Sequence, residues 1–427
     1  MSNTREISTK LLSKIYQGNS LENSVLLEKN FLNLEQRDKS FVLLILLNTL
    51  RRNGQIDSII SKLAKKPFKN DSFLRNLLRI SISQILFLDI PDYSTVNIAV
   101  EISKKYGSQK FVNAILRNVC RNKKDVLSQT PNHLNIPNWV KKDILDVFGH
   151  KNLDQIALEI AKEPLIDIRI KSKEFQSRDW EKTLNGKKIF NNLIRIQESS
   201  NIESLPYFKE GSWWVQGLSA TFPATIIDKV FEKFEKSKVS ILDVGAAPGG
   251  KTFQLLDSGY NVTSIEISKR RINKMEQNLN RLDLKTKLIN QDFFKYKTND
   301  LFDCILIDAP CSASGLMQKK PEILLRNKDI QSLVEKQRLM LKKASTLIKK
   351  GGYIIYSVCS ILSEEGKNQI QKFLIDQKSF SFEDVFGELK KYGKILNNKG
   401  FLTLPFLTSH NGGIDGFFIT CLKRNKL

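Results

Sequence analysis

The sequence predicts a multidomain protein with an all-α bundle at its N-terminus, a small α+β unit, and a C-terminal α/β domain built on a doubly wound sheet. A chain of 427 residues is too long for a single hydrophobic core. Helical spacing of apolar residues dominates up to about residue 125, whereas short apolar runs alternate with helical segments after residue 239. We expect four regions, at 1–125, 126–161, 162–217 and 218–427.

The N-terminal region reads as a bundle of six or seven helices. Ile7, Leu11 and Ile15 recur at helical spacing, and 41–50 is apolar almost all round, which is typical of a buried central helix. Residues 1–125 carry 21 Lys and Arg against 11 Asp and Glu, a net charge of +10. Any single lysine is most simply explained as part of a solvated helix face. The whole basic set indicates an RNA-binding module.

Two shorter regions follow. Residues 126–161 read as a helical linker, with a polar stretch containing two prolines at 128–137 and helices at 139–148 and 153–161. In 162–217, apolar and polar residues alternate along 164–171, which predicts a strand, and a helix at 180–184 and a strand at 193–196 complete a small α+β unit. We interpret this unit as an accessory RNA-binding layer.

From residue 239 onward the pattern is βαβαβ, which predicts a sheet covered by helices on both faces. The expected strands are 239–244, 262–267, 287–290, 302–308, 352–358 and 417–422, and the expected helices are 219–234, 250–257, 269–281, 329–350 and 363–376.

Composition narrows the class of protein. The net charge of +23 favours a polyanionic partner, nucleic acid first and a membrane surface second, with a generally basic proteome as the alternative. The five cysteines, at 120, 304, 311, 359 and 421, show no Cys-x-x-Cys spacing, which disfavours a zinc site or a disulfide framework. No apolar run reaches the about 18 residues of a membrane span. We therefore expect a cytoplasmic protein that uses neither metal nor membrane.

Candidate ligands of a small molecule follow the strands, because ligands of open α/β sheets bind beyond the carboxyl ends of the strands. The first strand leads into Gly245-Ala246-Ala247-Pro248-Gly249-Gly250-Lys251, and Glu266, Asp292 and Asp308 stand at the ends of the next three. An acidic residue at Glu266 suits the ribose of NAD and of S-adenosylmethionine equally. The loop lacks the G-x-G-x-x-G spacing of a dinucleotide site.

The loop also approaches the phosphate-binding pattern G-x-x-x-x-G-K-[ST], since Lys251 and Thr252 follow Gly250. A nucleoside triphosphatase is nevertheless disfavoured, because no apolar run ending in a magnesium-binding Asp is paired with a catalytic Glu. Glu266 would also have no role in such a site.

Two cysteines stand where the fourth and fifth of these strands end. A free cysteine is usually a small buried hydrophobe, which explains Cys120, Cys304 and Cys421. Cys311 and Cys359 instead lie in turn sequences just past neighbouring strands, beside Asp308. A thiolate that adds to carbon 6 of a pyrimidine makes carbon 5 able to attack a methyl donor. Asp308 could supply the proton at N3 if its pKa is raised in the cleft.

At these residues the chain resembles the RNA 5-methylcytosine methyltransferases with two active-site cysteines, and among them the bacterial small-subunit rRNA group called Sun/Fmu. The resemblance spans nearly the whole chain. It rests on Gly245–Thr252, Asp308-Ala-Pro-Cys-Ser-Ala-Ser-Gly315, Tyr356-Ser-Val-Cys-Ser-Ile361 with Ser363-Glu-Glu365, and Asp415-Gly-Phe-Phe418. Residues 1–125 look like the NusB-type RNA-binding domain of this group, and the catalytic domain is expected to be Rossmann-like.

The resemblance implies a role for each site residue. Cys359 would attack carbon 6, Cys311 would assist breakdown of the adduct, and Lys251 would help to position the base. S-adenosylmethionine would be bound by Gly245, Ala246, Ala247, Pro248, Gly249, Gly250, Lys251, Glu266, Asp292 and Asp308, and Asp308 would also contact the cytosine. The substrate would be 16S rRNA at a cytosine-967-type position, free or in an early small-subunit particle, and the protein would act as a monomer.

Three departures from the family pattern are present, with Val358 and Ser314 where Thr is common and Gly217 where Asp is usual. The spacing alone leaves open which thiol attacks, because DNA cytosine methyltransferases use a Pro-Cys cysteine, which would be Cys311. Two other functions also stay open: methylation of tRNA cytosine, and a non-catalytic RNA-binding assembly factor, which the intact acid and cysteine set disfavours.

Overall fold

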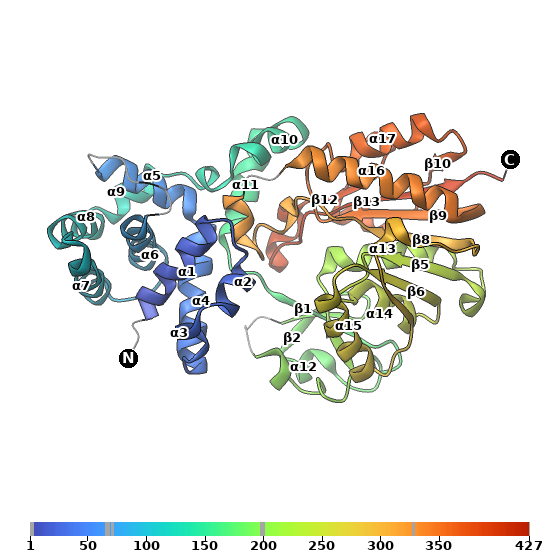
Figure 1. Cartoon of the computed structure of the whole chain (residues 1–427), viewed down its shortest axis with the longest axis horizontal. Coiled ribbons are helices and arrows are strands. Elements are labelled where there is room, and N and C mark those ends of the chain that lie inside the picture. The colour runs from blue at the N-terminus through green and yellow to red at the C-terminus, as the bar shows by residue number, and fades with distance from the viewer. Residues whose placement is uncertain (1–3, 65–68, 70–71, 197–200, 327–328, 427) are drawn as a thin grey trace. The chain divides into compact units, whose positions relative to one another are not determined.

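The computed structural model describes residues 4–64, 69, 72–196, 201–326 and 329–426 (Figure 1). The chain forms two compact units. The first comprises Met1–Glu163 and Met317–Asn327, and the second comprises Pro164–Leu316 and Lys328–Leu427. The first is called the helical unit below and the second the sheet unit.

The helical unit is built from short and medium helices. They are α1 (Thr4–Tyr16), α2 (Leu21–Leu26), α3 (Lys29–Leu32), α4 (Gln36–Arg51), α5 (Asn53–Leu63), α6 (Phe73–Phe87), α7 (Asp92–Ser103), α8 (Gln109–Arg121), α9 (Lys123–Ser128), α10 (Asn138–Phe148) and α11 (His150–Ala161). The expected helices at 139–148 and 153–161 are confirmed as α10 and α11, the latter beginning three residues earlier.

Two apolar clusters form the cores of this unit. In one, α1 and α4 pack together through buried residues such as Leu11, Ile45 and Leu46. The prediction of a buried central helix at 41–50 is confirmed, since α4 buries Val42, Ile45, Leu46 and Leu50. In the second, α5 to α8 pack around residues including Leu77 and Leu116.

A segment far away in the sequence completes the helical unit. The short helix η7 (Pro321–Leu325) contacts α4, and Leu325 packs against the core of α1 and α4. Arg51 Nε donates a hydrogen bond to the carbonyl oxygen of Gln318 at 3.0 Å. Burial lowers the pKa of Arg51 to about 10. The sequence predicted that 218–427 forms one continuous domain. The structure instead assigns Met317–Asn327, which begins only six residues after Cys311, to the helical unit.

The first part of the sheet unit is a four-stranded antiparallel sheet with strand order β2-β3-β1-β4. It contains β1 (Ile166–Ile170), α12 (Trp180–Thr183), β2 (Gly186–Phe190), β3 (Leu193–Ile196) and β4 (Trp213–Val215). The strands expected at 164–171 and 193–196 are confirmed, whereas β2 and β4 were missed. Arg195 and Asp167 form a buried ion pair at 2.6 Å, and Asp167 Oδ2 also accepts a hydrogen bond from the Leu218 amide at 2.9 Å.

The second part is a nine-stranded mixed sheet with strand order β11-β12-β13-β9-β8-β5-β6-β7, to which β10 adds by pairing with β13. Its strands are β5 (Ser240–Val244), β6 (Asn261–Glu266), β7 (Lys287–Asn290), β8 (Phe302–Asp308), β9 (Ile348–Val358), β10 (Phe380–Phe382), β11 (Gly393–Ile395), β12 (Phe401–Thr403) and β13 (Phe418–Arg424). Its helices are α13 (Leu218–Val230), α14 (Gly250–Asp257), α15 (Lys269–Arg281), α16 (Ile330–Leu347) and α17 (Lys367–Asp376).

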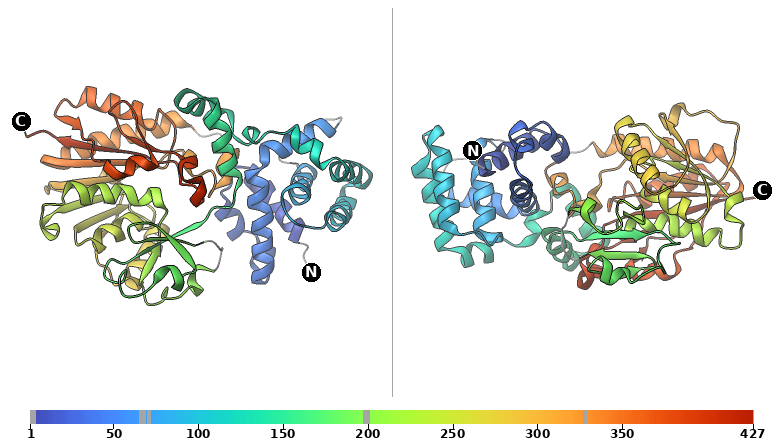
Figure 2. Two further views of the ribbon diagram at one scale, coloured as in Figure 1. Left: turned by 180° about the vertical axis from the view of Figure 1, so that it is seen from behind. Right: turned by 90° about the horizontal axis from the view of Figure 1, so that it is seen from below.

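Five strands, β7-β6-β5-β8-β9, run parallel, and β13 closes the far side of β9 in antiparallel pairing. Figure 1 shows α16 and α17 beside the β9 end of this sheet and α14 and α15 beside β6, and both views of Figure 2 show the C-terminal strands in orange to red side by side. The predicted α/β class with a doubly wound, Rossmann-like sheet is confirmed.

Several boundaries were predicted wrongly. The helix expected at 219–234 ends at Val230, and the strand expected at 352–358 begins at Ile348. The helix expected at 329–350 ends at Leu347, because Ile348 already pairs with Phe302 at the start of β9 and Lys349 forms an ion pair with Asp303 at 2.9 Å. The helix expected at 363–376 begins at Lys367, after Gly366, whose backbone is not helical at φ −108° and ψ −109°.

Candidate active site

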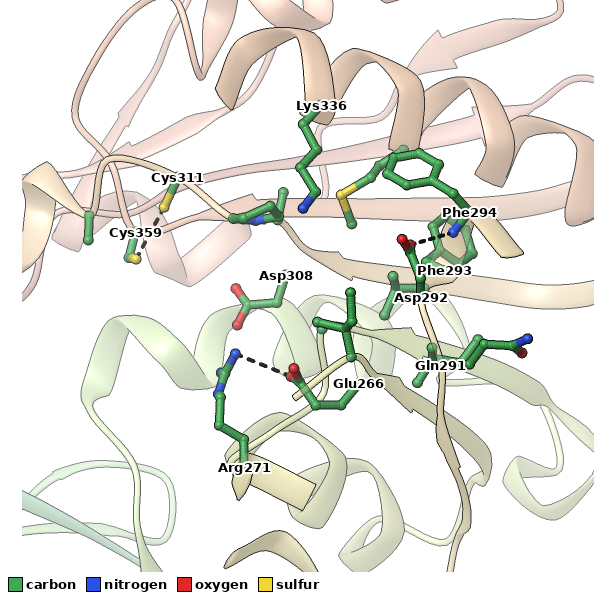
Figure 3. Close-up of a pocket in the computed structure, with 18 residues that line it drawn as sticks. Glu266, Arg271, Gln291, Asp292, Phe293, Phe294, Asp308, Cys311, Lys336 and Cys359 are labelled. Atoms are coloured by element: carbon green, nitrogen blue, oxygen red, sulfur yellow. Dashed lines mark hydrogen bonds and ion pairs between the residues drawn. The ribbon is translucent and has the colours of Figure 1, made fainter. Parts of the chain in front are cut away.

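The carboxyl ends of the parallel strands open into one pocket of about 260 Å³. Its lining gathers residues from the ends of β5, β6, β7, β8 and β9 and from α16 (Figure 3). These residues are Val244, Gly245, Ile265, Glu266, Ile267, Arg271, Gln291, Asp292, Phe293, Phe294, Asp308, Ala309, Pro310, Cys311, Ala313, Lys336, Met340 and Cys359. The structure therefore brings together Gly245, all three predicted carboxylates and both predicted cysteines.

The glycine-rich loop between β5 and α14 forms one wall. Gly245 has φ 79°, and a Cβ atom there would lie 2.5 Å from the Asp308 carbonyl oxygen, so only glycine fits this approach. Gly249, with φ 112°, precedes the first residue of α14, Gly250. Gly245 is the loop residue that lines the pocket; Ala246 and Ala247 are buried in an apolar cluster with Trp214 and Phe253, and Pro248 is exposed.

One end of the pocket carries two carboxylates with different surroundings. Glu266 is only 2% exposed, and its Oε1 accepts a hydrogen bond from the Ser268 amide at 2.9 Å. Arg271, one turn into α15, places its guanidinium 3.2 Å from Glu266 Oε2 and also donates to the Ala247 carbonyl oxygen (Figure 3). Asp292 Oδ1 accepts a hydrogen bond from the Phe294 amide at 2.9 Å.

This end suits an adenosine group. Glu266 Oε2 forms an ion pair with Arg271 but accepts no hydrogen bond among the described residues, so a diol could donate to it. Phe293 and Met340 supply the apolar surface that a purine ring needs. The residues present thus fit S-adenosylmethionine, whose adenosine would lie here and whose methionine would lie toward Gly245.

The other end holds the two thiols. Cys311 Sγ and Cys359 Sγ are 3.4 Å apart, although the residues are 48 positions apart in sequence. The predicted juxtaposition of these cysteines is therefore present in the structure. Asp308 stands beside them and forms an ion pair with Lys251 at 2.7 Å, with the Lys251 side chain only 11% exposed. Lys251 Nζ also lies over the Phe417 ring, at 5.7 Å from its centroid.

The surroundings of the cysteines distinguish them. The hydrogen bond with Cys359, burial, and nearby negative charge raise the pKa of the Cys311 thiol well above its usual value. Cys304 and Cys421 are fully buried within strands, and burial raises the pKa of both thiols. Their interpretation as packing residues agrees with this position, and Cys120 lies in α8 of the helical unit, partly buried.

The loop after Cys311 is fixed by backbone contacts. The Gly315 amide donates to the Cys359 carbonyl oxygen at 3.0 Å. The Asp415-Gly-Phe-Phe418 motif reaches the same place, since the Gly416 amide donates to the Gly315 carbonyl oxygen at 3.0 Å. A Cβ atom on Gly315 would lie 1.7 Å from the Gly416 carbonyl oxygen. Close approach of the two backbones explains why glycine stands at both positions.

Sequence reasoning missed part of the lining. Arg271 lies five residues after Glu266 at the start of a helix. Because Lys269 and Arg270 precede it, the sequence does not show which of these three basic residues lines the pocket. Phe293, Met340 and Lys336 were also missed, because apolar or basic residues on a helix face have no motif of their own. Within the described ranges, no group of three or more His, Cys, Asp or Glu could hold a metal ion.

The fold and the site define a class: a parallel sheet with a glycine-rich turn, an adenosine-type pocket and no dinucleotide spacing is that of a methyltransferase dependent on S-adenosylmethionine. Residues 232–423 match the family described as 16S rRNA methyltransferase RsmB/F, and residues 2–121 match the NusB family. The chain belongs to the family of ribosomal RNA small subunit methyltransferase B, and it is an S-adenosylmethionine-dependent rRNA methyltransferase.

Relatives support this membership along the chain. Ribosomal RNA small subunit methyltransferase B of Photorhabdus laumondii is 31% identical over 99% of this chain and 99% of its own length. That of Proteus mirabilis is 31% identical over 87% and 91%. A solved structure described as PH0851 shares the fold with a TM-score of 0.74 at 20% identity, covering 99% of this chain and 100% of that one.

In the part of the chain that the structure describes, no helix is long and apolar enough to cross a membrane.

Proposed function

We propose that the chain methylates carbon 5 of one cytosine in 16S rRNA, at a cytosine-967-type position, through a covalent adduct between Cys359 Sγ and carbon 6 of the base. The observation that carries this proposal is the pair of thiols 3.4 Å apart, next to the Asp308–Lys251 ion pair and at one end of the pocket. Neither a ribose nor an adenine requires a thiol, whereas addition to carbon 6 of a pyrimidine uses one thiolate, and a second thiol can assist release of the adduct.

In this mechanism the Cys359 thiolate adds to carbon 6 while N3 receives a proton, so that the electron pair of the 5,6 double bond becomes available at carbon 5. The Asp308–Lys251 pair contacts the base and gives its proton to N3, and this proton returns to the pair when the adduct is released. Gly245, Glu266 and Asp292 would hold S-adenosylmethionine, which when bound would supply an electrophilic methyl group to carbon 5 and leave as S-adenosylhomocysteine. Cys311 then removes the carbon 5 proton, the Cys359–carbon 6 bond breaks, and the thiolate leaves with its electron pair.

Other assignments belong to the same proposal. Residues 1–125 would bind RNA, with 126–161 as a helical linker, 162–217 as an accessory RNA-binding domain and 218–427 as the catalytic domain. The protein would act as a monomer in the cytoplasm on free 16S rRNA or an early small-subunit particle. The net charge of +23 supports an RNA partner. The target base must be unstacked or single-stranded for a thiol to reach carbon 6.

The decisive experiment maps 5-methylcytosine in 16S rRNA and tRNA from a deletion strain, before and after the gene is restored. Loss and recovery of one 16S rRNA site supports the proposal. Loss of a tRNA site instead supports a tRNA cytosine-C5 methyltransferase, and no change in either RNA supports a non-catalytic assembly factor. Methyl transfer by the purified protein to unmethylated 16S rRNA, with Cys359→Ala as control, then ties the site to this chain.

A further inference from the structure

Glu365 is a carboxylate that the chemistry above does not use, and it is fully buried. Its Oε1 accepts hydrogen bonds from the Ser312 amide at 2.8 Å and from Gln337 Nε2 at 3.1 Å, and its Oε2 accepts one from Ser312 Oγ at 2.5 Å. Among the described residues, no Lys, Arg or His forms an ion pair with it. A carboxylate buried without a cation depends on such hydrogen bonds, so the donors around it are held in place.

These donors flank Cys311 on both sides. Ser312 is the next residue in the chain, and Gln337 of α16 also donates to the carbonyl oxygen of Pro310, the preceding residue, at 2.9 Å. Glu365 is anchored in turn to β9, since its carbonyl oxygen accepts a hydrogen bond from Tyr356 Oη at 2.8 Å, three residues before Cys359. Glu365 therefore connects the Cys311 loop, through its side chain, with the strand that precedes Cys359, through its backbone carbonyl oxygen.

Three serine hydroxyl groups extend the connection. Ser360, directly after Cys359, has its Oγ 3.2 Å from Ser312 Oγ and 3.0 Å from Ser314 Oγ. All three serines are fully buried. A buried polar network of this kind tolerates few alternative geometries, because each unmade hydrogen bond is costly in a low-dielectric interior.

We propose that Glu365 is a positioning residue that holds the Cys311 loop against the end of β9, so that the Cys311 thiol stands at the adduct formed by Cys359. This inference rests on the covalent mechanism proposed above. Cys359 itself follows a strand paired on both sides, through Asp308–Ser357 and Val358–Phe418, so its place is set by the backbone. Loss of Glu365 is therefore expected to impair release of the adduct more than its formation.

The charge of Glu365 gives a second readout. Besides the hydrogen bond with Cys359 and burial, the negative charge of Glu365 contributes to the raised pKa of Cys311. The other ionisable groups near this thiol are Asp308 at the end of β8, Lys251 of α14, Tyr356 of β9 and Lys336 of α16. Glu365→Gln keeps the shape and removes the charge, so the Cys311 thiolate forms at lower pH and the pH profile of release shifts downward.

The test uses the full-length protein with S-adenosylmethionine and an unmethylated 16S rRNA fragment. Adduct formation is measured by trapping on 5-fluorocytosine RNA, and release by turnover and by the amount of protein–RNA adduct on ordinary RNA in denaturing gels. In Glu365→Ala we expect trapping within about threefold of the unchanged protein, and kcat lower by about tenfold to a hundredfold with KM for S-adenosylmethionine unchanged. Adduct should accumulate on ordinary RNA.

Two variants keep this test decisive. Glu364→Ala removes the neighbouring, exposed carboxylate and should behave as the unchanged protein. If Glu365→Ala does not fold, Glu365→Gln still decides, because a downward shift of its pH profile supports the proposal and an unshifted profile overturns it. Equal loss of trapping and turnover in folded Glu365→Ala would also overturn it. Failure of the unchanged protein to trap 5-fluorocytosine RNA would instead remove the covalent mechanism itself.

Discussion

Cys359 and Cys311 reach the same place by different means. Cys359 directly follows β9, whose last residues pair with β8 on one side and with β13 on the other. Cys311 lies in a loop between β8 and η6 (Ser314–Leu316), and its neighbours are held by Glu365, Gln337 and three serines. The position of Cys359 follows from strand pairing, whereas that of Cys311 depends on side-chain hydrogen bonds in addition to the backbone contacts of its loop.

This difference matches the division of tasks in the proposed mechanism. Attack on carbon 6 needs a nucleophile whose geometry is set before the RNA arrives, which a strand end provides. Release needs a group that acts after the methyl group has been added, and the hydrogen bonds of Glu365 and Gln337 hold the Cys311 loop in place for that later step. Substitutions at the two segments should therefore affect different steps.

The largest effect is expected from Cys359→Ala. Removal of the nucleophile should lower methyl transfer to unmethylated 16S rRNA by about four orders of magnitude or more, the scale seen when a catalytic nucleophile is lost. Tritiated methyl incorporation measures this. Cys120→Ala in the helical unit is the matched control and should keep full activity. Substantial activity in Cys359→Ala would show that Cys311 attacks carbon 6, so that the roles proposed for the two thiols would be exchanged.

A smaller effect is expected from Ser312→Ala, a change in the Cys311 segment that leaves the strand pairing before Cys359 intact. The change leaves Glu365 Oε2 without its hydroxyl donor, and a buried acceptor left unsatisfied costs about 1–3 kcal/mol. We expect kcat to fall about tenfold, while the rate of trapping on 5-fluorocytosine RNA stays near that of the unchanged protein. Ser237→Ala, at an exposed serine, is the control. A parallel fall in trapping would show that the two segments do not act separately.

Glu266→Gln tests the far end of the pocket, which should be independent of both thiols. Loss of the carboxylate charge weakens acceptance of hydrogen bonds from a ribose, so the Kd of S-adenosylmethionine should rise about tenfold, or about 1.4 kcal/mol. Calorimetric titration measures this, and kcat at saturating cofactor should change little. A large drop in kcat with unchanged Kd would place Glu266 in the chemistry rather than in cofactor binding.

The smallest effect on activity is expected at Asp243, at the end of β5, whose charge bears on stability instead. Burial raises its pKa to about 6 from 3.8, although Thr252 Oγ1 donates a hydrogen bond to it at 2.5 Å. A raised folded-state pKa means that the folded protein binds the proton more tightly, so this group's contribution to stability declines as pH rises from about 4 to about 6. It stays low above pH 6.

Asp243→Asn removes that pH dependence. Relative to the unchanged protein, the free energy of unfolding of the variant should improve by about 2 kcal/mol between pH 4 and pH 7, as chemical denaturation at each pH would show. Asp300→Asn, at an exposed site, is the control. If the difference in free energy of unfolding between Asp243→Asn and the unchanged protein were the same at pH 4 and pH 7, the raised pKa of Asp243 would be contradicted.

Much of the fold and the centre of the site followed from the sequence. Apolar runs ending in Asp243, Glu266 and Asp308 identify strands by their own residues, and parallel order then brings their ends together. The same reasoning placed Cys311 beside Cys359. These features depend only on the local pattern of apolar residues and on the rule that the carboxyl ends of parallel strands meet at one edge of the sheet.

Other features depend on contacts that no local pattern records. Glu364 and Glu365 look alike in sequence, yet one is exposed and the other fully buried, because the turn before α17 directs only the second inward. Arg271 reaches Glu266 through a helix start that its basic neighbours share. The segment around η7 joins the helical unit through Leu325 and the carbonyl oxygen of Gln318, neither of which carries a motif.

The most direct test of the two-thiol account is trapping on 5-fluorocytosine 16S rRNA with S-adenosylmethionine, followed by denaturing gels, for Cys359→Ala and Cys311→Ala in parallel. The account predicts no covalent protein–RNA species with Cys359→Ala. It predicts trapping with Cys311→Ala, together with accumulation of adduct on ordinary RNA. A covalent species that forms with Cys359→Ala and is absent with Cys311→Ala would contradict it.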